Sequence, residues 1–266
     1  MEIFPPCRQL YSSTKGTEGY DKIYRIRNYL TMLGENIRRE YQLSREISID
    51  ETMIPHKGRL SYKQYIKNKP TKWLIKLWVL SEATTGYVYR FQVYLGKVEG
   101  NPEQHLAKRV VRDLTITEAN KNHHLYMDNF YCDPHLFKEL LDKKIFCCGT
   151  VKFNRKGFPQ EVVITKERQK QMRRGDYLWR CDGQLVASGW LDKRPVYHLS
   201  TSHPPTTNEP TTVARREGRG ERQSLQCPTG LSEVYGWGGS DRPNDKEFLS
   251  FAEVKKGLEK AFQLRT

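Results

Sequence analysis

The pattern of apolar and polar positions predicts a helix followed by a strand near the start of the chain. Over residues 21–41, apolar side chains recur at every third or fourth position with arginines largely off that stripe, which predicts an amphipathic helix. Asp21 is placed to cap its first turn. Residues 46–49 then alternate and end in Asp50, so we predict a strand that buries its isoleucines and terminates on carboxylates.

Strands and helices continue along the middle of the chain. Residues 73–80 form a mostly apolar run and residues 87–95 alternate again, which predicts two strands joined by a hairpin. A helical segment over residues 105–114 leads to a fourth strand at 124–127, which ends at Asp128. A capped helix beginning at Asp133-Pro134 and a fifth strand over 145–151 complete the series. This order predicts an α/β fold with a mixed sheet flanked by helices.

A basic segment with strand patterns follows this predicted core. Over residues 152–174, eight Lys and Arg stand against two Glu. Three short strand patterns come next, at residues 177–180, 185–188 and 195–199, so we expect a small β-rich insertion. Residues 201–226 are rich in Thr, Pro, Arg and Gly with weak periodicity, which predicts a linker.

Composition narrows the class of protein. The 266 residues carry 45 Lys and Arg against 31 Asp and Glu, a formal charge of +14, which favours an acidic partner. No apolar run approaches the ~18 residues of a membrane span, so we expect no membrane partner. The six cysteines contain no pair at zinc-ribbon spacing, and the start of the chain lacks the apolar region of a secretory signal. We therefore expect free thiols in a reducing compartment.

Two aspartates are candidate metal ligands. Asp50 and Asp128 end the first and fourth predicted strands, which are commonly neighbours in such a sheet. Hard oxygen ligands brought together in this way suit Mg²⁺ or Mn²⁺, and a two-metal site normally needs a third carboxylate for phosphodiester chemistry. The alternative is that both aspartates only terminate strands and stabilise turns.

Basic residues interleaved with aromatic ones favour the metal interpretation, because Lys and Arg contact phosphates and aromatic rings stack on bases. The alternative is a solvated basic face. The candidate nucleic-acid-binding residues fall in two stretches of the chain: Lys57, Arg59, Lys63, Lys67, Lys69 and Lys72, then Lys152, Arg155, Lys156, Arg173 and Arg174.

Several motifs resemble the catalytic domain of piggyBac-type transposases, including the transposon-derived vertebrate proteins of that family. They are, in order, ISIDETMIPHKGR (47–59), KQYIKNKPTKW (63–73), LYMDNF (125–130), CGTV (148–151) and NRKG (154–157). The likeness extends over roughly residues 20 to 205. It implies an RNase H-like fold, double-stranded DNA as the partner and the nucleus as the location.

The resemblance also implies a reaction. Family members hydrolyse the transposon end with Mg²⁺ or Mn²⁺, form a hairpin through the freed 3′-OH and join it at a TTAA target. Asp50 and Asp128 match the first two catalytic aspartates. The third follows a Cys-Pro in the family, and here Cys227-Pro228 precedes YGWGGSDRPNDK (235–246), so Asp241 is the best match and Asp245 the second.

The third motif departs from the family pattern. Ser240 replaces a valine, Lys246 replaces a glutamine, and Pro243 enters a segment where a helix would start. Because proline is tolerated only in a helix's first turn, Asp241 would lie just before that helix rather than on it. A misplacement of an ångström can cost ~10²-fold in rate.

Three hypotheses follow: a DNA-binding core with residual nuclease or strand-transfer chemistry, an inactive domesticated DNA- or chromatin-binding module, or a protein-interaction scaffold. The sequence leaves open whether the chain forms a homodimer. We expect five segments: an N-terminal helical segment (1–44), the first part of the RNase H-like core (45–151), a basic β-rich insert (152–200), a linker (201–226) and a degenerate C-terminal helical part of the core (227–266).

Overall fold

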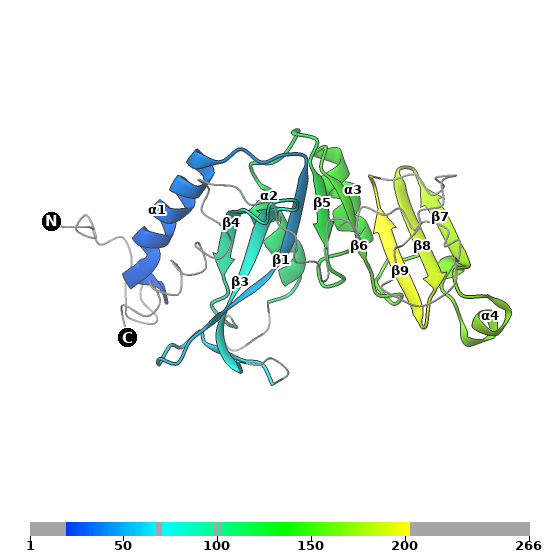
Figure 1. Cartoon of the computed structure of the whole chain (residues 1–266), viewed down its shortest axis with the longest axis horizontal. Coiled ribbons are helices and arrows are strands. Elements are labelled where there is room, and N and C mark those ends of the chain that lie inside the picture. Colours follow the sequence, from blue (N-terminus) through cyan, green and yellow to red (C-terminus); the bar gives the residue numbers. More distant parts are fainter. Residues whose placement is uncertain (1–19, 68–70, 98–100, 102, 203–266) are drawn as a thin grey trace, which may run out of the picture. The chain divides into compact units, whose positions relative to one another are not determined.

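The structure is a computed structural model that describes residues 20–67, 71–97, 101 and 103–202. These residues group into two compact units. The first unit holds residues 20–44 and 49–114, and the second holds residues 45–48 and 115–202. Figure 1 shows that each unit combines strands with helices, so the predicted α/β class is confirmed.

The first unit is a small sheet with a helix at each end of its sequence. Strand β3 lies between β1 and β2, and β4 also pairs with β3, in antiparallel fashion. The predicted hairpin over residues 73–95 is therefore confirmed. The elements are α1 (Tyr24–Glu40), β1 (Glu46–Pro55), β2 (Gln64–Tyr65), β3 (Trp73–Glu82), β4 (Val88–Val93) and α2 (Leu106–Thr115).

Helix α1 packs its apolar stripe on this sheet. Ile26, Leu30 and Ile37 are buried in one cluster with Leu77 and Val79 of β3. The helix begins at Tyr24, later than predicted. The predicted cap at Asp21 is wrong, because Ile23 is at the cap position and makes no side-chain cap bond. Asp21 instead accepts hydrogen bonds from the Ile23 backbone and the Arg27 guanidinium.

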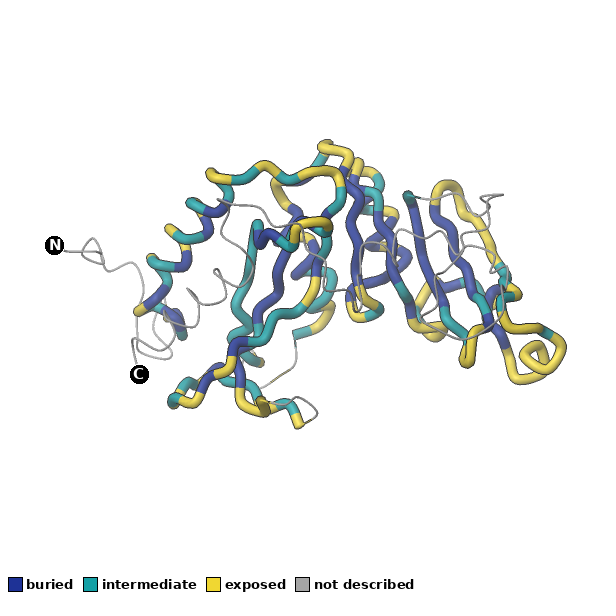
Figure 2. The backbone as a smooth tube through the Cα atoms, viewed as in Figure 1, coloured by how far each residue is buried: buried dark blue, intermediate teal, exposed yellow. Residues whose placement is uncertain are grey.

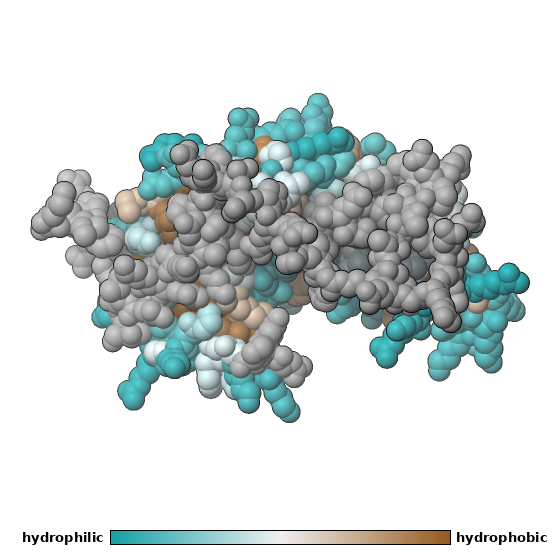
Figure 3. Space-filling model, viewed as in Figure 1, coloured by the Kyte–Doolittle hydropathy of each residue, from teal (hydrophilic) through white to brown (hydrophobic). Residues whose placement is uncertain are grey.

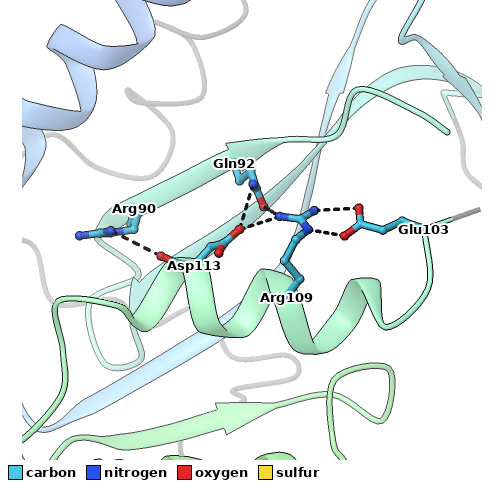
Figure 4. Close-up of polar contacts among 5 residues, drawn as sticks. All are labelled: Arg90, Gln92, Glu103, Arg109 and Asp113. Carbon is cyan, nitrogen blue, oxygen red and sulfur yellow. Dashed lines mark hydrogen bonds and ion pairs between the residues drawn. The ribbon is translucent and has the colours of Figure 1, made fainter. Parts of the chain in front are cut away.

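Helix α2 is tied to β4 by polar side chains (Figure 4). Arg109 donates to Gln92 at 3.1 Å and to Asp113 at 2.6 Å, and it also pairs with Glu103. Its guanidinium carbon lies 5.9 Å from the ring centroid of the buried Trp78. Arg109 thus lies over the edge of the core, and Glu103 and Asp113 balance its charge.

The second unit carries the parallel part of the sheet. Strands β5 and β6 pair in parallel, and β6, β9, β8 and β7 follow as antiparallel neighbours. The predicted insertion is thus built onto the edge of β6 rather than standing apart from it. The elements are β5 (His124–Met127), α3 (Pro134–Asp142), β6 (Phe146–Thr150), a 3₁₀ turn η1 (Gln160–Val162), α4 (Lys166–Gln171), β7 (Tyr177–Asp182), β8 (Leu185–Leu191) and β9 (Pro195–Ser200).

Burial follows the strands (Figure 2). All four residues of β5 are buried, as expected of a strand covered on both faces. Helix α3 contacts β6 and β8, and its predicted cap is confirmed because Asp133 accepts from the backbone of His135 and Leu136. Figure 3 shows that the described surface of the face in view is largely hydrophilic.

Cysteines and membrane segments complete the description. Cys132, Cys147 and Cys148 are buried free thiols, and Cys181 is an exposed one. Cys7 and Cys227 lie outside the described residues. Within the described ranges, no helix is long and apolar enough to cross a membrane. The predicted linker and C-terminal helical part also fall outside those ranges.

Candidate functional site

Asp128 lies where β5 ends and the chain turns sharply toward α3. The backbone N–H groups of Tyr131 and Cys132 both donate to the Asp128 carbonyl oxygen, at 3.0 and 3.3 Å. Asp133 then caps α3, so residues 128–133 form a short closed connection, which we call the Asp128 loop. Because Asp133 supplies the cap, the Asp128 side chain is not needed for it.

The Asp128 carboxylate is exposed and held from one side. Its Oδ1 accepts a hydrogen bond from the Asn129 backbone at 2.5 Å and lies 3.4 Å from Thr150 Oγ1 on β6. Among the described residues, no partner contacts Oδ2. An oriented carboxylate with one oxygen available is suited to bind a cation or a proton.

A glycine on β6 allows the Asp128 loop to sit this close. Gly149 is paired with Met127, and a Cβ added there would lie 2.1 Å from the Met127 carbonyl oxygen and 2.5 Å from Cys132 Sγ. Both distances are far below contact distance, and the first involves backbone that cannot rotate away. The glycine of the CGTV motif (148–151) thus has a packing role that the motif by itself does not indicate.

Arg155 holds the other side of the Asp128 loop. Its guanidinium donates to the Asn129 carbonyl at 2.7 Å and to the Phe130 carbonyl at 3.3 Å. The side chain is half-buried, unlike the neighbouring Lys152 and Lys156, which are exposed. All three residues are predicted nucleic-acid contacts, and Arg155 in addition holds the Asp128 loop in place.

Asp50 lies in the first unit and inside a strand. The prediction that the first strand ends at Asp50 is wrong, because β1 continues to Pro55. It does so because its later residues border β3, where Lys76 donates to Glu51 at 2.7 Å and the His56 backbone donates to Trp73. Asp50 is exposed, and its Oδ1 accepts from the Glu51 backbone at 2.7 Å.

The three predicted catalytic aspartates are therefore placed differently. Asp50 belongs to the first unit and Asp128 to the second, and Asp241 lies outside the described residues. Over the ranges that the structure describes, no group of three or more His, Cys, Asp or Glu side chains gathers as a metal site. The shared site stays a prediction.

Two exposed aromatic rings mark the first basic stretch. Tyr65 on β2 is the register partner of Trp73 on β3, and the ring centroids are 5.0 Å apart. The two side chains are 52% and 50% exposed, which is unusual for rings of this size. Lys63 donates to the Gly58 carbonyl, and its Nζ lies 4.8 Å from the Trp73 ring centroid. We call the segment from Lys57 to Trp73 the aromatic hairpin.

The charge of the aromatic hairpin comes from lysine and arginine alone. His56 is buried at its base, and burial together with the nearby Lys63 charge lowers the pKa of His56. Its imidazole is thus neutral at pH 7. The predicted basic residues of this hairpin that the structure describes are exposed, except for the half-buried Lys63; they are Lys57, Arg59, Lys67 and Lys72, and Lys69 lies outside the described residues.

The second predicted basic group lies in the second unit. Lys152, Lys156, Arg173 and Arg174 are exposed. Arg174 forms an ion pair with Asp192, which offsets part of its charge. The two groups belong to separate units, so each is described as its own surface.

Comparison with known proteins identifies the family. The profile of the family described as Transposase IS4 matches residues 7–233, most of the chain. The chain belongs to this transposase family. Its relatives are of the piggyBac type, so the resemblance drawn from the motifs is confirmed.

Two human relatives show the same extent of likeness. PiggyBac transposable element-derived protein 3 is 29% identical over 238 residues, which cover 85% of this chain and 38% of that protein. The chimeric ERCC6-PGBD3 protein is also 29% identical over 238 residues, with 85% and 22% covered. The chain therefore spans well under half the length of these relatives.

A solved structure of a piggyBac transposase synaptic complex with hairpin DNA matches the fold. Its TM-score is 0.61 at 25% identity, over 71% of this chain and 40% of that one. The predicted RNase H-like fold is confirmed by this match.

Proposed function

We propose that this chain is a DNA-binding piggyBac-type catalytic core, located in the nucleus, whose Asp50, Asp128 and Asp241 together hold Mg²⁺ or Mn²⁺ for DNA cleavage and strand transfer. The observation that carries the proposal is the Asp128 loop, in which an exposed carboxylate is oriented at a strand end. Membership of the transposase family and the DNA in the matched synaptic complex support it.

The donor chemistry fits a divalent cation. Asp128 offers an oxygen without a partner among the described residues, and Asp50 presents a second exposed carboxylate. Bound metal would activate the attacking water or 3′-OH and stabilise the leaving oxygen. The residues of the chain orient these ligands: Gly149 and Arg155 hold the Asp128 loop, and the pairing of β1 with β3 keeps Asp50 at its place.

DNA contacts come from the basic and aromatic side chains. The exposed lysines of the aromatic hairpin supply charge for phosphates, and Tyr65 and Trp73 supply faces for unpaired bases. Lys152, Lys156, Arg173 and Arg174 give the second unit its own positive surface. A double-stranded DNA whose end or flank is unpaired matches this combination.

The alternative is an inactive, domesticated DNA- or chromatin-binding module. It is favoured by the departures around Asp241, where Pro243 and Lys246 interrupt the family motif. A homodimer is compatible with either function. Measuring the molar mass of the purified protein in solution would determine whether it forms.

A metal titration separates the two functions. Mn²⁺ or Mg²⁺ should raise the melting temperature of the wild type, because a ligand that binds only the folded state stabilises it. Asp50→Asn, Asp128→Asn and Asp241→Asn should each abolish this rise. Asp142→Asn, which removes an exposed carboxylate at the end of α3, should keep it. Repeating the metal titration with a DNA duplex present would also detect a metal site that needs DNA phosphates as ligands.

DNA cleavage is the second readout. Asp128→Asn should remove metal-dependent cleavage and leave DNA affinity equal or higher, since it takes a negative charge from the binding surface. Cleavage that survives this change would refute the catalytic assignment. A wild type that binds DNA with a steep salt dependence but shows no metal response would establish the inactive module instead.

A further inference from the structure

A pocket in the second unit is not explained by the predicted catalytic or DNA-binding residues. It lies between the start of α3, the residues around Gly157 and the hairpin of β7 and β8. Its floor is apolar, with Pro134, Leu185 and Leu199 buried beneath it. All of its lining residues belong to the second unit. We call it the α3 pocket.

The rim of the α3 pocket is mainly basic. Arg180, Lys138 and His135 line it together with one acid, Asp182. Lys138 forms an ion pair with Asp182, so these two charges offset each other. Arg180 is exposed, and no described residue pairs with its guanidinium. The net charge available to a ligand is therefore that of Arg180, with His135 as a further donor.

The size of the α3 pocket limits the occupant. Its volume is about 170 Å³. Pockets for drug-sized ligands hold about 300–1,000 Å³. The occupant is therefore a compact group with a negative charge. Side chains supply its contacts, because the backbone N–H groups of His135 and Leu136 at the start of α3 already donate to Asp133.

The position of the α3 pocket links it to Asp128 through the backbone. The Asp128 loop leads directly into Pro134 and His135, which both line the pocket. Arg155, which holds this loop, is two residues from Gly157, where an added Cβ would lie 3.4 Å from His135 Nε2. The α3 pocket and Asp128 thus belong to the same unit and are joined by the Asp128 loop.

From these observations we propose that the α3 pocket binds one backbone phosphate of the DNA strand that approaches Asp128, with Arg180 as its main contact. The proposal rests on the DNA-binding function above and adds a specific subsite to it. Arg180 suits this task because its planar guanidinium can donate two parallel hydrogen bonds to phosphate oxygens. Lys138 and His135 add donors from α3.

Salt-dependent DNA binding tests the subsite with paired variants. Arg180→Gln removes one phosphate contact. It should therefore reduce the magnitude of the slope of log K against log salt by ~0.9 and weaken DNA binding about three- to tenfold. Arg194→Gln is the control: it removes the same charge from an exposed arginine in the turn at the other end of β8. That variant should change affinity less than about twofold.

A gain of affinity excludes misfolding as the explanation. Asp182→Asn removes the one acid of the rim and frees Lys138. It should tighten DNA binding about two- to fivefold, because a repelling charge is lost and an attracting one is released. Equal affinity of the wild type and this variant, together with equal effects of Arg180→Gln and Arg194→Gln, would overturn the proposal.

Cys181 reports occupancy directly. It lines the α3 pocket as an exposed thiol, whereas Cys132, Cys147 and Cys148 are buried. A DNA duplex should slow alkylation of Cys181 by iodoacetamide, measured on its peptide by mass spectrometry, and Arg180→Gln should remove this protection. DNA that binds without protecting Cys181 contradicts the subsite alone.

Two further outcomes have different meanings. Failure of the wild type to bind DNA at low salt rejects the DNA-binding function. Protection of Cys181 by polyglutamate instead of DNA would assign the pocket to an acidic protein.

Discussion

The aromatic hairpin and the Asp128 loop both expose their functional groups but hold them differently. In the first unit, the rings of Tyr65 and Trp73 are half exposed, and Lys63 lies over the Trp73 ring. In the second unit, Asp128 follows tightly packed backbone: Gly149 and Cys132 are buried, and a Cβ at Gly149 would clash with the Met127 carbonyl oxygen. One region offers exposed basic and aromatic side chains to a partner, and the other holds a single carboxylate on closely packed backbone.

This difference suggests a division of tasks. Charged and aromatic side chains can adapt to a nucleic acid, since phosphates and base faces recur along any strand. A metal ligand has to be placed within a fraction of an ångström, which requires close packing. Substitutions in the Asp128 loop should therefore act on stability and catalysis, and substitutions in the aromatic hairpin should act on binding.

The largest effect is expected at Gly149. Gly149→Ala should lower the free energy of unfolding by more than about 3 kcal/mol, because its Cβ would clash with the Met127 carbonyl. Gly34→Ala in α1 is the matched control. Its nearest neighbour is the flexible end of Arg38, so the alanine should stabilise the helix by about 0.5–1 kcal/mol. Urea unfolding measures both, and two equal effects would refute the packing argument.

The second prediction concerns acid stability of the second unit. Burial raises the pKa of Glu118, but contacts with His123, Thr117 and Lys121 outweigh it and lower that pKa to about 2 from 4.5. A carboxyl with a depressed folded-state pKa stabilises the fold above its unfolded value and loses this contribution as pH falls. The shift corresponds to about 3 kcal/mol.

Glu118→Gln should accordingly destabilise the protein by up to about 3 kcal/mol at pH 7. The gap between variant and wild type should shrink as pH falls from 5 toward 2, which urea unfolding at several pH values can follow. Glu161→Gln, at an exposed position, is the control and should show no such dependence. A gap that stays constant with pH would contradict the assignment.

A smaller effect is expected from the exposed rings. Trp73→Ala should weaken binding of DNA with unpaired bases by about 1–3 kcal/mol, the usual value of one stacked base, and should weaken binding of fully paired DNA less. Trp179→Ala removes an exposed indole of the second unit, 41% exposed, and should leave both affinities unchanged. Fluorescence anisotropy with the two DNA forms makes the comparison. Equal losses for both variants would remove the special role of the aromatic hairpin.

The smallest effect is expected from a single lysine. Lys72→Gln should lower the salt slope of DNA binding by ~0.9 and change stability little. Lys143→Gln, which removes a lysine already paired with Glu139 on α3, should leave the slope unchanged. An unchanged slope in Lys72→Gln would remove this residue from the DNA-binding surface.

The sequence alone determined the class of fold and the elements that carry the candidate residues. Helical spacing located α1 and α3, strand-like runs located β3 and β5, alternation located β4, and the Asp133-Pro134 pair located the start of α3. These patterns succeed because they record which face of each element is buried, a property that neighbouring residues share. The ordered motifs added the transposase family.

Only the tertiary structure decided how the site is supported. The extension of β1 past Asp50 depends on β3, the role of Gly149 depends on the backbone of Met127, and Arg155 contacts a loop 26 residues earlier. The α3 pocket likewise joins residues from 134 to 199. None of these features has a local signal, because each arises from contacts between residues far apart in the chain, which the pattern of a single segment does not contain.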